Sequence, residues 1–319
     1  MACLVRSVRV NDNMKNGYIL MKEYLTEKDC AELAALEGVV KKEGINLKLE
    51  LDYKKNLSDY KNTVNRNPCC MKEYLYYADE KPVSYLGICS FGGNIYELNG
   101  MTHPDYRGRG LFHGIFDHAL AECKRFGKDK LLLLTDGKSE SGIRFIESVG
   151  GDYAFSEHRM KLPASEYVST GSNTDVSQVT LREAVAEDAA LIHRLDRILY
   201  ADEVEQEEEE AVTDGTRSGD PTLLVNTYLI ELAGECVGKI RIDFSEAEGF
   251  LYGFGILPEY RGKGYGKVAL REALRIIFDK GIPGAALDVE AKNDRALSIY
   301  KGCGFRAVSE MRYYKNLLS

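Results

Sequence analysis

The sequence predicts a mixed α/β (α+β) protein built from two tandem domains of one fold, each with a mixed, mostly antiparallel sheet that contains a parallel crossover and is flanked by helices. Two observations predict this class. A glycine-rich basic turn, Pro-Asp-Tyr-Arg-Gly-Arg-Gly at 104–110, recurs as Pro-Glu-Tyr-Arg-Gly-Lys-Gly at 258–264, which is 154 residues later (261 − 107). The same offset, without a gap, pairs many further residues of the two halves, among them Gly150 with Gly304. This register indicates that the halves arose by duplication. Half of 319 residues is also a common domain size.

A polar segment separates the two copies. Residues 163–178 are rich in Ser, Thr, Asn and Gly and poor in apolar side chains, which is typical of a linker. We therefore expect a first domain at 17–162 and a second at 179–319. Residues 1–16 precede both as an N-terminal arm. Its apolar residues, compatible with a short extra strand as well as with an arm, are Leu4, Val5, Val8 and Val10.

The second domain gives the clearer succession of elements. We expect, in order, a strand at 179–183, a helix at 186–200, a hairpin of strands at 226–232 and 238–244, a strand at 250–257, a helix at 264–280, a strand at 285–290, a helix at 294–302 and a last strand at 306–316. The helix at 264–280 carries apolar residues at steps of three and four, from Ala269 to Ile277. Gly281 and Pro283 end it. A strand, helix and strand in this order make a right-handed parallel crossover.

Composition excludes several classes of protein. The net charge of −8 gives no global field that favours nucleic acid. No apolar run approaches the ~20 residues that span a bilayer, and the N-terminus has no signal-peptide core. We therefore expect a cytoplasmic protein with neither a nucleic-acid nor a membrane partner.

The eight cysteines show no Cys-x-x-Cys pair and no histidine at metal-ligand spacing. We expect no metal site. Most of them lie in apolar stretches and are interpreted as buried thiols, which suits a reducing cytoplasm. Cys69 and Cys70 are adjacent, and a redox role for them is disfavoured because neighbouring cysteines bridge only with strain.

The turn at 258–267 predicts an anion site. A strand that ends in a glycine-rich turn and enters a helix presents free N–H groups and the positive end of the helix dipole. Glycines let a phosphate approach the main chain, and Arg261, Lys263 and Lys267 add positive charge. The pattern is neither a P-loop, since Val268 follows Lys267, nor a Gly-x-Gly-x-x-Gly dinucleotide turn.

These motifs resemble the GNAT superfamily of acetyl-CoA-dependent N-acetyltransferases, and the resemblance covers nearly the whole chain outside the linker and the arm. The family's pyrophosphate signature is Arg or Gln, two residues, Gly, one residue, then Gly or Ala; Arg261, Gly264 and Gly266 fill it. The family also carries an Asn seven residues before a Tyr, just ahead of Gly-Phe, and Asn293 and Tyr300 match. In organisation, the chain resembles tandem acetyltransferases such as mycothiol synthase.

The resemblance implies roles for named residues. Tyr300 matches the position that protonates the departing sulfur of coenzyme A. A protonated amine needs a base, and Asp288, ranked first, and Glu290 are the candidate carboxylates. The strand at 254–256 receives the pantetheine arm and polarises the carbonyl. The implied cofactor-binding residues are Phe254, Gly255, Ile256, Arg261, Gly262, Lys263, Gly264, Tyr265, Gly266, Lys267 and Asn293.

Each candidate also has a structural interpretation. Tyr300 suits a helix core, and the two carboxylates suit a solvated strand end. The acidic run at 203–210 is typical of a solvated segment, yet it lies where the family builds its acceptor pocket and would attract a cationic amine. Tyr313 and Tyr314 are assigned to packing of the last strand, with a border of the substrate cleft as the alternative.

The first domain departs from the family pattern where chemistry would occur. Phe112 stands at the position of the last glycine, Ser139 at the Asn position and Ile146 at the Tyr position. Isoleucine cannot donate a proton, so we expect this domain to be structural or to shape the acceptor site, while its turn at 107–110 stays compatible with CoA or another anion. His103 is interpreted as a surface or packing residue. The segment 45–71 has no counterpart in the second domain and is a candidate wall of a shared cleft.

We therefore expect an acetyl-CoA-dependent N-acetyltransferase that acts through its C-terminal domain on the primary amine of a small molecule or peptide. Two alternatives keep the fold: a transferase that uses a longer acyl-CoA, and a non-catalytic acyl-CoA-binding sensor or scaffold. The sequence leaves the acceptor and the oligomeric state open, because such folds recognise acceptors through variable loops.

Overall fold

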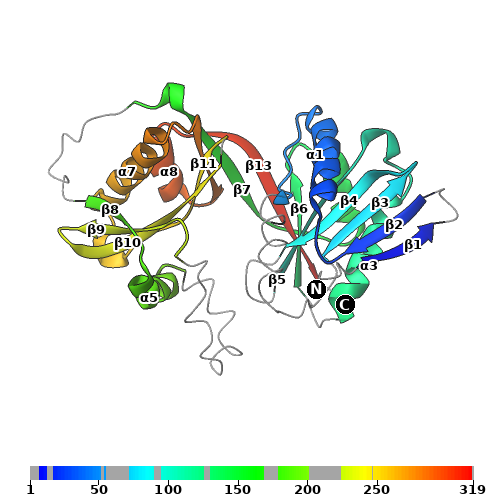
Figure 1. The fold of residues 1–319 in the computed structure, drawn as a ribbon, viewed down its shortest axis with the longest axis horizontal. Coiled ribbons are helices and arrows are strands. Elements are labelled where there is room, and N and C mark those ends of the chain that lie inside the picture. The colour runs from blue at the N-terminus through cyan, green and yellow to red at the C-terminus, as the bar shows by residue number, and fades with distance from the viewer. Residues whose placement is uncertain are drawn as a thin grey trace. The chain divides into compact units, whose positions relative to one another are not determined.

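The computed structural model describes residues 7–12, 17–51, 54, 72–89, 95–125, 130–168, 179–200, 224–245 and 247–317 (Figure 1). Its elements are β1 (Ser7–Asp12), β2 (Gly17–Lys22), α1 (Glu27–Lys41), β3 (Glu73–Ala78), β4 (Lys81–Cys89), β5 (Ile95–Thr102), η1 (Pro104–Tyr106), α3 (Leu111–Arg125), β6 (Lys130–Asp136), α4 (Glu140–Ser148), β7 (Asp152–Pro163), η2 (Ala164–Glu166), β8 (Val179–Glu183), η3 (Ala186–Asp188), α5 (Ala189–Leu199), β9 (Thr227–Leu232), β10 (Glu235–Phe244), β11 (Gly249–Ile256), η6 (Pro258–Tyr260), α7 (Tyr265–Asp279), β12 (Gly284–Glu290), α8 (Asp294–Lys301) and β13 (Arg306–Leu317). The η elements are single 3₁₀ turns.

The duplication predicted from the sequence is present in the structure. Strand β3 begins at Glu73 and β9 at Thr227, which are 154 residues apart (227 − 73). The pairs β5 and β11, α3 and α7, β6 and β12, and β7 and β13 repeat with the same offset at both ends. The mixed α/β class is therefore confirmed.

The chain divides into two compact units, and the last strand of each half belongs to the other half's unit. Unit 1 comprises Met1–Ser156 and Glu310–Ser319, and unit 2 comprises Glu157–Ser309. In unit 1 the strand order is β1-β2-β3-β4-β5-β6-β13, and in unit 2 it is β7-β12-β11-β10-β9-β8. Both divisions fall inside twelve-residue strands, β7 and β13, and not inside the polar segment that follows Pro163.

Each sheet is antiparallel except at one pair of strands. In unit 1, β5 and β6 are parallel, and the outer neighbour of β6 is β13, through Met311–Leu317. In unit 2, β11 and β12 are parallel, and the outer neighbour of β12 is β7, through Glu157–Pro163. The parallel pairs are the crossovers that the sequence predicts, each made through α3 or α7.

Helices cover both faces of each sheet. Neighbouring residues of a strand point to opposite faces, so they pack against different helices. In unit 1, Tyr74 packs with Ile115 of α3, whereas Leu75 packs with Leu33 of α1. In unit 2, Ile230 packs with α7, whereas the next-door Leu229 packs with α5. The apolar stripe of α7 is fully buried as predicted; its members are Ala269, Leu270, Ala273, Leu274 and Ile277.

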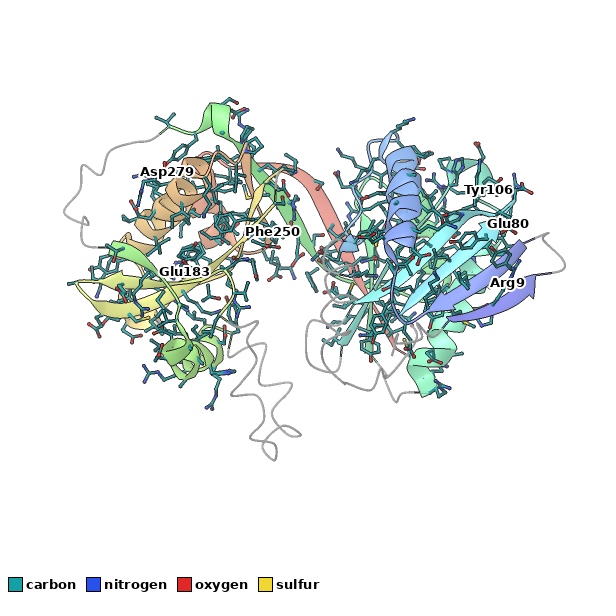
Figure 2. The ribbon with its side chains drawn as sticks, in the orientation of Figure 1. Arg9, Glu80, Tyr106, Glu183, Phe250 and Asp279 are labelled. Atoms are coloured by element: carbon teal, nitrogen blue, oxygen red, sulfur yellow. The ribbon has the colours of Figure 1, made fainter. Side chains whose placement is uncertain are left out.

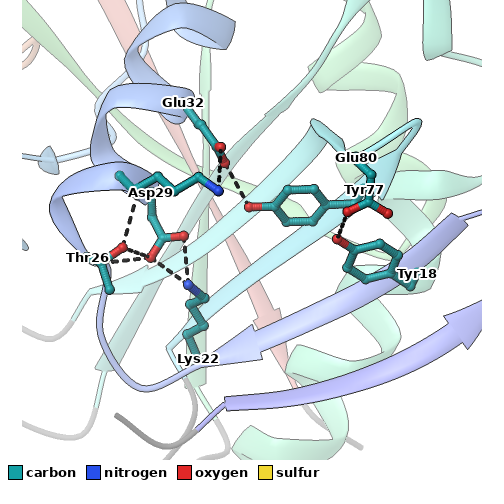
Figure 3. Close-up of polar contacts among 8 residues, drawn as sticks. Tyr18, Lys22, Thr26, Asp29, Glu32, Tyr77 and Glu80 are labelled. Carbon is teal, nitrogen blue, oxygen red and sulfur yellow. Dashed lines mark hydrogen bonds and ion pairs between the residues drawn. The ribbon is translucent and has the colours of Figure 1, made fainter.

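A capping box fixes the start of α1 (Figure 3). The Thr26 hydroxyl accepts from the amide of Asp29, and the Asp29 carboxylate accepts from the amide of Thr26 at 2.8 Å. Lys22 of β2 donates to both carboxylate oxygens at 2.6 and 2.7 Å, so it ties the helix to the sheet. Burial raises the pKa of Asp29, but the hydrogen bonds from Lys22 and Thr26 outweigh burial and lower the pKa below its usual value.

The structure describes the N-terminal strand and the last strand, whereas three segments discussed above lie outside the described residues. Of the two interpretations of the arm, the strand is observed, since β1 pairs with β2 over Ser7–Asp12. Tyr313 stacks on Phe155 and Tyr314 lies in the core of unit 1, so both pack the last strand. The expected linker beyond residue 168, the acidic run at 203–210 and the pair Cys69 and Cys70 lie outside the described residues.

Candidate functional site

The glycine-rich turn of unit 2 links β11 to α7 and is braced by Arg261. Its Nε–H donates to the carbonyl oxygen of Ile256 at 2.7 Å, which fastens the turn to the last residue of the strand. Gly262 and Gly264 have φ of +79° and +87°, in the left-handed region that favours glycine. The sequence predicts glycines here for the close approach of a phosphate, and the structure adds that their positive φ also favours glycine.

The turn leaves a row of main-chain donors open. The amides of Lys267 and Val268 donate to the carbonyl oxygen of Gly264, but the amides from Lys263 to Gly266 have no acceptor among the described residues. Residues 261–264 are exposed. The start of a 15-residue helix therefore presents several donors and its positive dipole end to solvent, which suits a diphosphate.

Strand β11 carries a bulge beside this turn. Its register with β10 pairs Tyr252 with Arg241 and Gly255 with Lys239, so β11 has one residue more than its partner there. Gly253, with φ of +56°, lies in the bulge. Pairing with β12 ends at Leu251, so the predicted residues Phe254, Gly255 and Ile256 have no strand partner on that side, and the carbonyl oxygen of Ile256 accepts from Arg261.

Tyr300 lies on α8 and packs against the core of unit 2 on the same face as α7. Its ring meets Phe305 edge-on at 6.1 Å between centroids. No described residue hydrogen-bonds to its hydroxyl, and burial raises the pKa of this phenol to about 12. Asn293 begins the same helix: its Oδ1 accepts from the amide of Ala296 at 3.0 Å, so it is the N-cap of α8.

The two candidate carboxylates share the other face of the sheet. Asp288 and Glu290 are two residues apart on β12, so both point away from the core that Val289 joins. Asp288 accepts a hydrogen bond from Arg159 at 3.3 Å, and the Arg159 guanidinium lies over the ring of Phe250, labelled in Figure 2, at 4.4 Å. Glu290 is exposed.

This placement separates the candidate acid from the candidate bases. Tyr300 lies with α7 on one face of the sheet, whereas Asp288 and Glu290 lie on the face that α5 covers. The strands β11 and β12 are paired only as far as Leu251 and Leu287. An acetyl donor on the α7 face and an amine acceptor on the α5 face would meet where β11 and β12 separate.

One buried charged pair was missed by the sequence reasoning. Lys239 of β10 is 2% exposed, and its Nζ lies 2.5 Å from Oδ1 of Asp196 on α5. Burial lowers the pKa of Lys239, against the opposing effect of Asp196. A Cβ built on Gly253 would lie 3.5 Å from this Nζ, so the ammonium lies under the bulge. The available signal was one lysine within the apolar stretch 237–242.

The matching turn of unit 1 is braced by an equivalent arginine, but the terminal nitrogens of this arginine have a carboxylate partner. Arg107 donates its Nε–H to Thr102 at 3.2 Å, and its terminal nitrogens donate to both oxygens of Glu43 at 2.6 and 3.2 Å. Ser139 caps α4 through the amide of Gly142 at 3.2 Å, as Asn293 caps α8. Ile146 is 3% exposed in the core, where unit 2 has Tyr300.

The predicted packing role of His103 agrees with its contacts. Its Nδ1 accepts from the amide of Asp105 at 3.2 Å, and its ring meets Tyr106 edge-on. In the described part of the chain no three His, Cys, Asp or Glu side chains gather as metal ligands would. Nor does any helix there have the length and apolar character needed to cross a membrane.

Residues 189–305, from α5 through the turn and α7 to Phe305, match the model of the acetyltransferase (GNAT) family. Unit 2 carries a GNAT-family domain. A mycothiol acetyltransferase of Streptomyces griseus is 29% identical over 210 residues, which are 64% of this chain and 66% of that protein. One of Nocardioides is 26% identical over 226 residues, 66% of this chain and 76% of that protein. The chain thus spans about two thirds of the first relative's length.

Solved structures extend the GNAT fold to both units. A GCN5-related N-acetyltransferase of Sphaerobacter thermophilus has a TM-score of 0.69 at 14% identity, over 92% of this chain and 94% of that one. A tandem GNAT protein from the clavulanic acid biosynthesis pathway has a TM-score of 0.63 at 11% identity, over 99% of each chain. At these identities the likeness concerns the fold, and it supports the tandem GNAT architecture.

Proposed function

We propose that the protein is an acetyl-CoA-dependent N-acetyltransferase whose unit 2 transfers an acetyl group to the primary amine of a small molecule or peptide. The observation that carries this proposal is the open row of amides from Lys263 to Gly266 on the same sheet face as the phenol of Tyr300. A diphosphate and a thioester need these two features side by side: main-chain donors for the anion, and a neutral acid for the leaving sulfur.

The residues of unit 2 fit coenzyme A. The open amides would hold the diphosphate, with positive charge from Arg261, Lys263 and Lys267. The open edge of β11 at 254–256 would accept the pantetheine arm as an added strand does. When bound, acetyl-CoA supplies an activated acetyl thioester. An amide of the β11 bulge would stabilise the oxyanion that develops on it.

Tyr300 would donate a hydrogen bond to the leaving sulfur. A pKa of about 12 keeps this phenol neutral at physiological pH, so it is a donor throughout the working range. The thiol of coenzyme A has a reference pKa of about 8.5, below that of the phenol, so full proton transfer from the phenol to the thiolate is uphill, and the phenol would stabilise the departing thiolate by donating a hydrogen bond to it.

The acceptor amine would arrive on the face covered by α5. With a reference pKa of about 10.4, it arrives protonated and must lose a proton before attack. Asp288 and Glu290 are our candidate bases, directly or through water. Asp288 already accepts a hydrogen bond from Arg159, whereas Glu290 is exposed.

A small cationic amine is the acceptor class that we propose. Glu290 is exposed on the side of the sheet that α5 covers and would attract it, whereas Asp196 and Asp288 are each paired with a cation. The relatives named mycothiol acetyltransferase also favour a small acceptor. We further propose that the reaction takes place in a reducing cytoplasm, since Cys89 is a buried free thiol.

The test of the working unit is a matched pair of variants. Gly264→Trp and Gly110→Trp put the same bulk at equivalent positions of the two turns, both at positive φ. We expect Gly264→Trp to abolish the binding of CoA measured by calorimetry, and Gly110→Trp to leave it within about twofold of wild type. Equal losses in both variants would refute the assignment of the site to unit 2. Tight CoA binding by wild type without turnover on any amine would favour the sensor.

A further inference from the structure

A buried lysine lies beneath the bulge of β11, and the transfer reaction proposed for unit 2 assigns it no role so far. Lys239 of β10 is 2% exposed, and its register partner on β11 is Gly255, at the edge of the bulge. A Cβ built on Gly253, inside the bulge, would lie 3.5 Å from the Nζ atom of Lys239. The ammonium therefore lies against the segment of β11 whose amide would stabilise the oxyanion.

Helix α5 holds this ammonium in place. The Oδ1 atom of Asp196 lies 2.5 Å from Nζ, and the ring of Tyr200, at the end of the same helix, lies 5.6 Å from it. An ammonium has three N–H donors, and Asp196 is its one hydrogen-bonding partner among the described residues. The side chain of Asp196 is 31% exposed, against 2% for Lys239. The pair thus turns its positive end to the bulge and its negative end toward solvent.

Stability alone does not account for this pair. Removing two charges from water has a cost that often exceeds their mutual attraction, and apolar residues of similar size are commonly as stable in their place. In Lys239, burial lowers the pKa against the opposing effect of Asp196, so the loss of hydration is the larger influence. A buried cation at this position is therefore better explained by a role in the reaction.

Unit 1 forms the same sheet without this lysine and without the bulge. At the offset of 154 residues (239 − 85), Tyr85 takes the place of Lys239, and Asn99 takes that of Gly253. The register of β4 with β5 is regular throughout, whereas that of β10 with β11 shifts after Lys239. The fold thus forms without either feature, and both occur in the unit that keeps the phenol of Tyr300.

We propose that Lys239 and Asp196 are positioning residues of the acetyl transfer, a role that rests on the function proposed for unit 2. An ammonium attracts carbonyl oxygens and repels N–H groups, so Lys239 favours orientations of the bulge whose amides point away from it. It also adds positive potential near the oxyanion in an environment of low dielectric constant, where charges interact strongly. Lys239 acts through β11 and needs no contact with the substrate.

Two variants that lack the ammonium test this role on the full chain. Lys239→Met leaves Asp196 in partial contact with water, and the double variant Lys239→Met with Asp196→Leu removes both charges. Turnover of acetyl-CoA is measured with cadaverine, spermidine and tyramine, beside CoA affinity by calorimetry and chemical denaturation. We expect CoA to bind within about twofold of wild type, and kcat and kcat/KM to fall together by at least about tenfold, which marks an interaction made in the transition state.

Arg182→Met is the matched control. Arg182 of β8 donates to Asp188 at 2.8 and 3.0 Å and to Glu231 at 2.7 Å, so it too fastens α5 to the sheet. The strands β9 and β10 separate it from β11. This variant should keep kcat within about twofold of wild type. A loss of kcat equal to that of the Lys239 variants would assign the effect to the anchoring of α5 and overturn the proposal.

The outcomes separate this inference from the proposed function. Wild-type kcat in a folded Lys239 variant would refute the positioning role and leave the proposed function intact. A loss of CoA affinity in parallel with kcat, or failure of both variants to fold, would show that the pair is structural and overturn the proposal. Absence of turnover by wild type on all three amines would instead count against the proposed function, and this inference would fall with it.

Discussion

Arg261 donates its Nε–H to the carbonyl oxygen of Ile256 at 2.7 Å and thereby joins the glycine-rich turn to the end of β11. Arg107 makes the equivalent bond to Thr102 at 3.2 Å, so the two arginines share a structural role. They differ at their terminal nitrogens. Glu43 holds those of Arg107, whereas no described residue holds those of Arg261. The same brace is therefore present in both turns, but only in unit 1 are the terminal nitrogens of the arginine paired with a carboxylate of a described residue.

Replacing the brace tests this difference. Arg261→Lys keeps the charge but loses the planar fork and the Nε bond. We expect the affinity for CoA to fall by about tenfold, the size of one charge-assisted hydrogen bond. Arg107→Lys is the matched control and should leave CoA affinity unchanged. A weaker affinity in the Arg107 variant, measured by calorimetry, would contradict the view that unit 1 takes no CoA.

Transplanting the unit 1 residue into unit 2 makes a stronger prediction. A Cβ at Gly266 would lie 3.6 Å from the ring of Phe254, so Gly266→Phe should fill the space between α7 and β11, as the ring of Phe112 lies against Gly100 of β5 in unit 1. We expect CoA affinity to fall by at least about tenfold, a loss of ~1.4 kcal/mol. Phe112→Leu is the control and should not change CoA binding. CoA binding by Gly266→Phe at wild-type strength would show that the pantetheine arm takes another path.

Much of the fold follows from local sequence signals. The apolar stripe from Ala269 to Ile277 predicted α7 to within one residue at each end. Its helical period and the helix-ending residues after it agree on the same bounds. The hairpin of strands expected at 226–232 and 238–244 is present, and Ala233 and Gly234 between its strands both have positive φ. The offset between the two glycine-rich turns revealed the duplication. These features depend on residues close in sequence or on direct repetition.

Features that depend on distant partners were not predictable. Strands β7 and β13 have the same pattern whichever sheet they join, so the sequence does not reveal their exchange between the units. The pair of Lys239 and Asp196 joins α5 to β10 across 43 residues (239 − 196). At the candidate site, Asn293 was expected to contact cofactor, and the structure adds that its Oδ1 caps α8. The contact itself stays a prediction.

The capping box of α1 gives a prediction for stability. Asp29→Asn should weaken α1 by about 1 kcal/mol, the usual effect of a lost cap. The pKa of Asp29 is lowered by folding, so its contribution is present above the unfolded value near 3.9 and is lost as pH falls through the folded value. Hydrogen exchange of the amides of 27–41 measures this.

The pH dependence and a surface control complete that test. The difference between wild type and Asp29→Asn should be full at pH 7 and shrink below about pH 4. Lys28→Ala removes only an exposed pair and should change exchange by no more than about 0.5 kcal/mol. A difference that persists unchanged at low pH would show that the charge of Asp29 is not what stabilises the helix.

The buried pair beneath the bulge gives a fourth prediction. Asp196→Asn leaves the ammonium of Lys239 buried without a counter-charge, so we expect a loss of about 3 kcal/mol in the free energy of unfolding. The double variant Lys239→Met with Asp196→Leu should recover most of it, because both charges are gone. Chemical denaturation followed by circular dichroism measures both. If the double variant does not recover stability, the loss in Asp196→Asn is not caused by the unpaired charge of Lys239 alone.

Tyr300→Phe tests the central claim most directly, with turnover of acetyl-CoA on a panel of small amines measured beside CoA affinity. The variant removes one hydroxyl from a half-buried ring, so CoA should bind within about twofold of wild type. We predict that kcat falls by about 10²–10⁴-fold, the range of a lost general acid. Unchanged kcat in Tyr300→Phe, with wild type active on the same amine, would contradict the account.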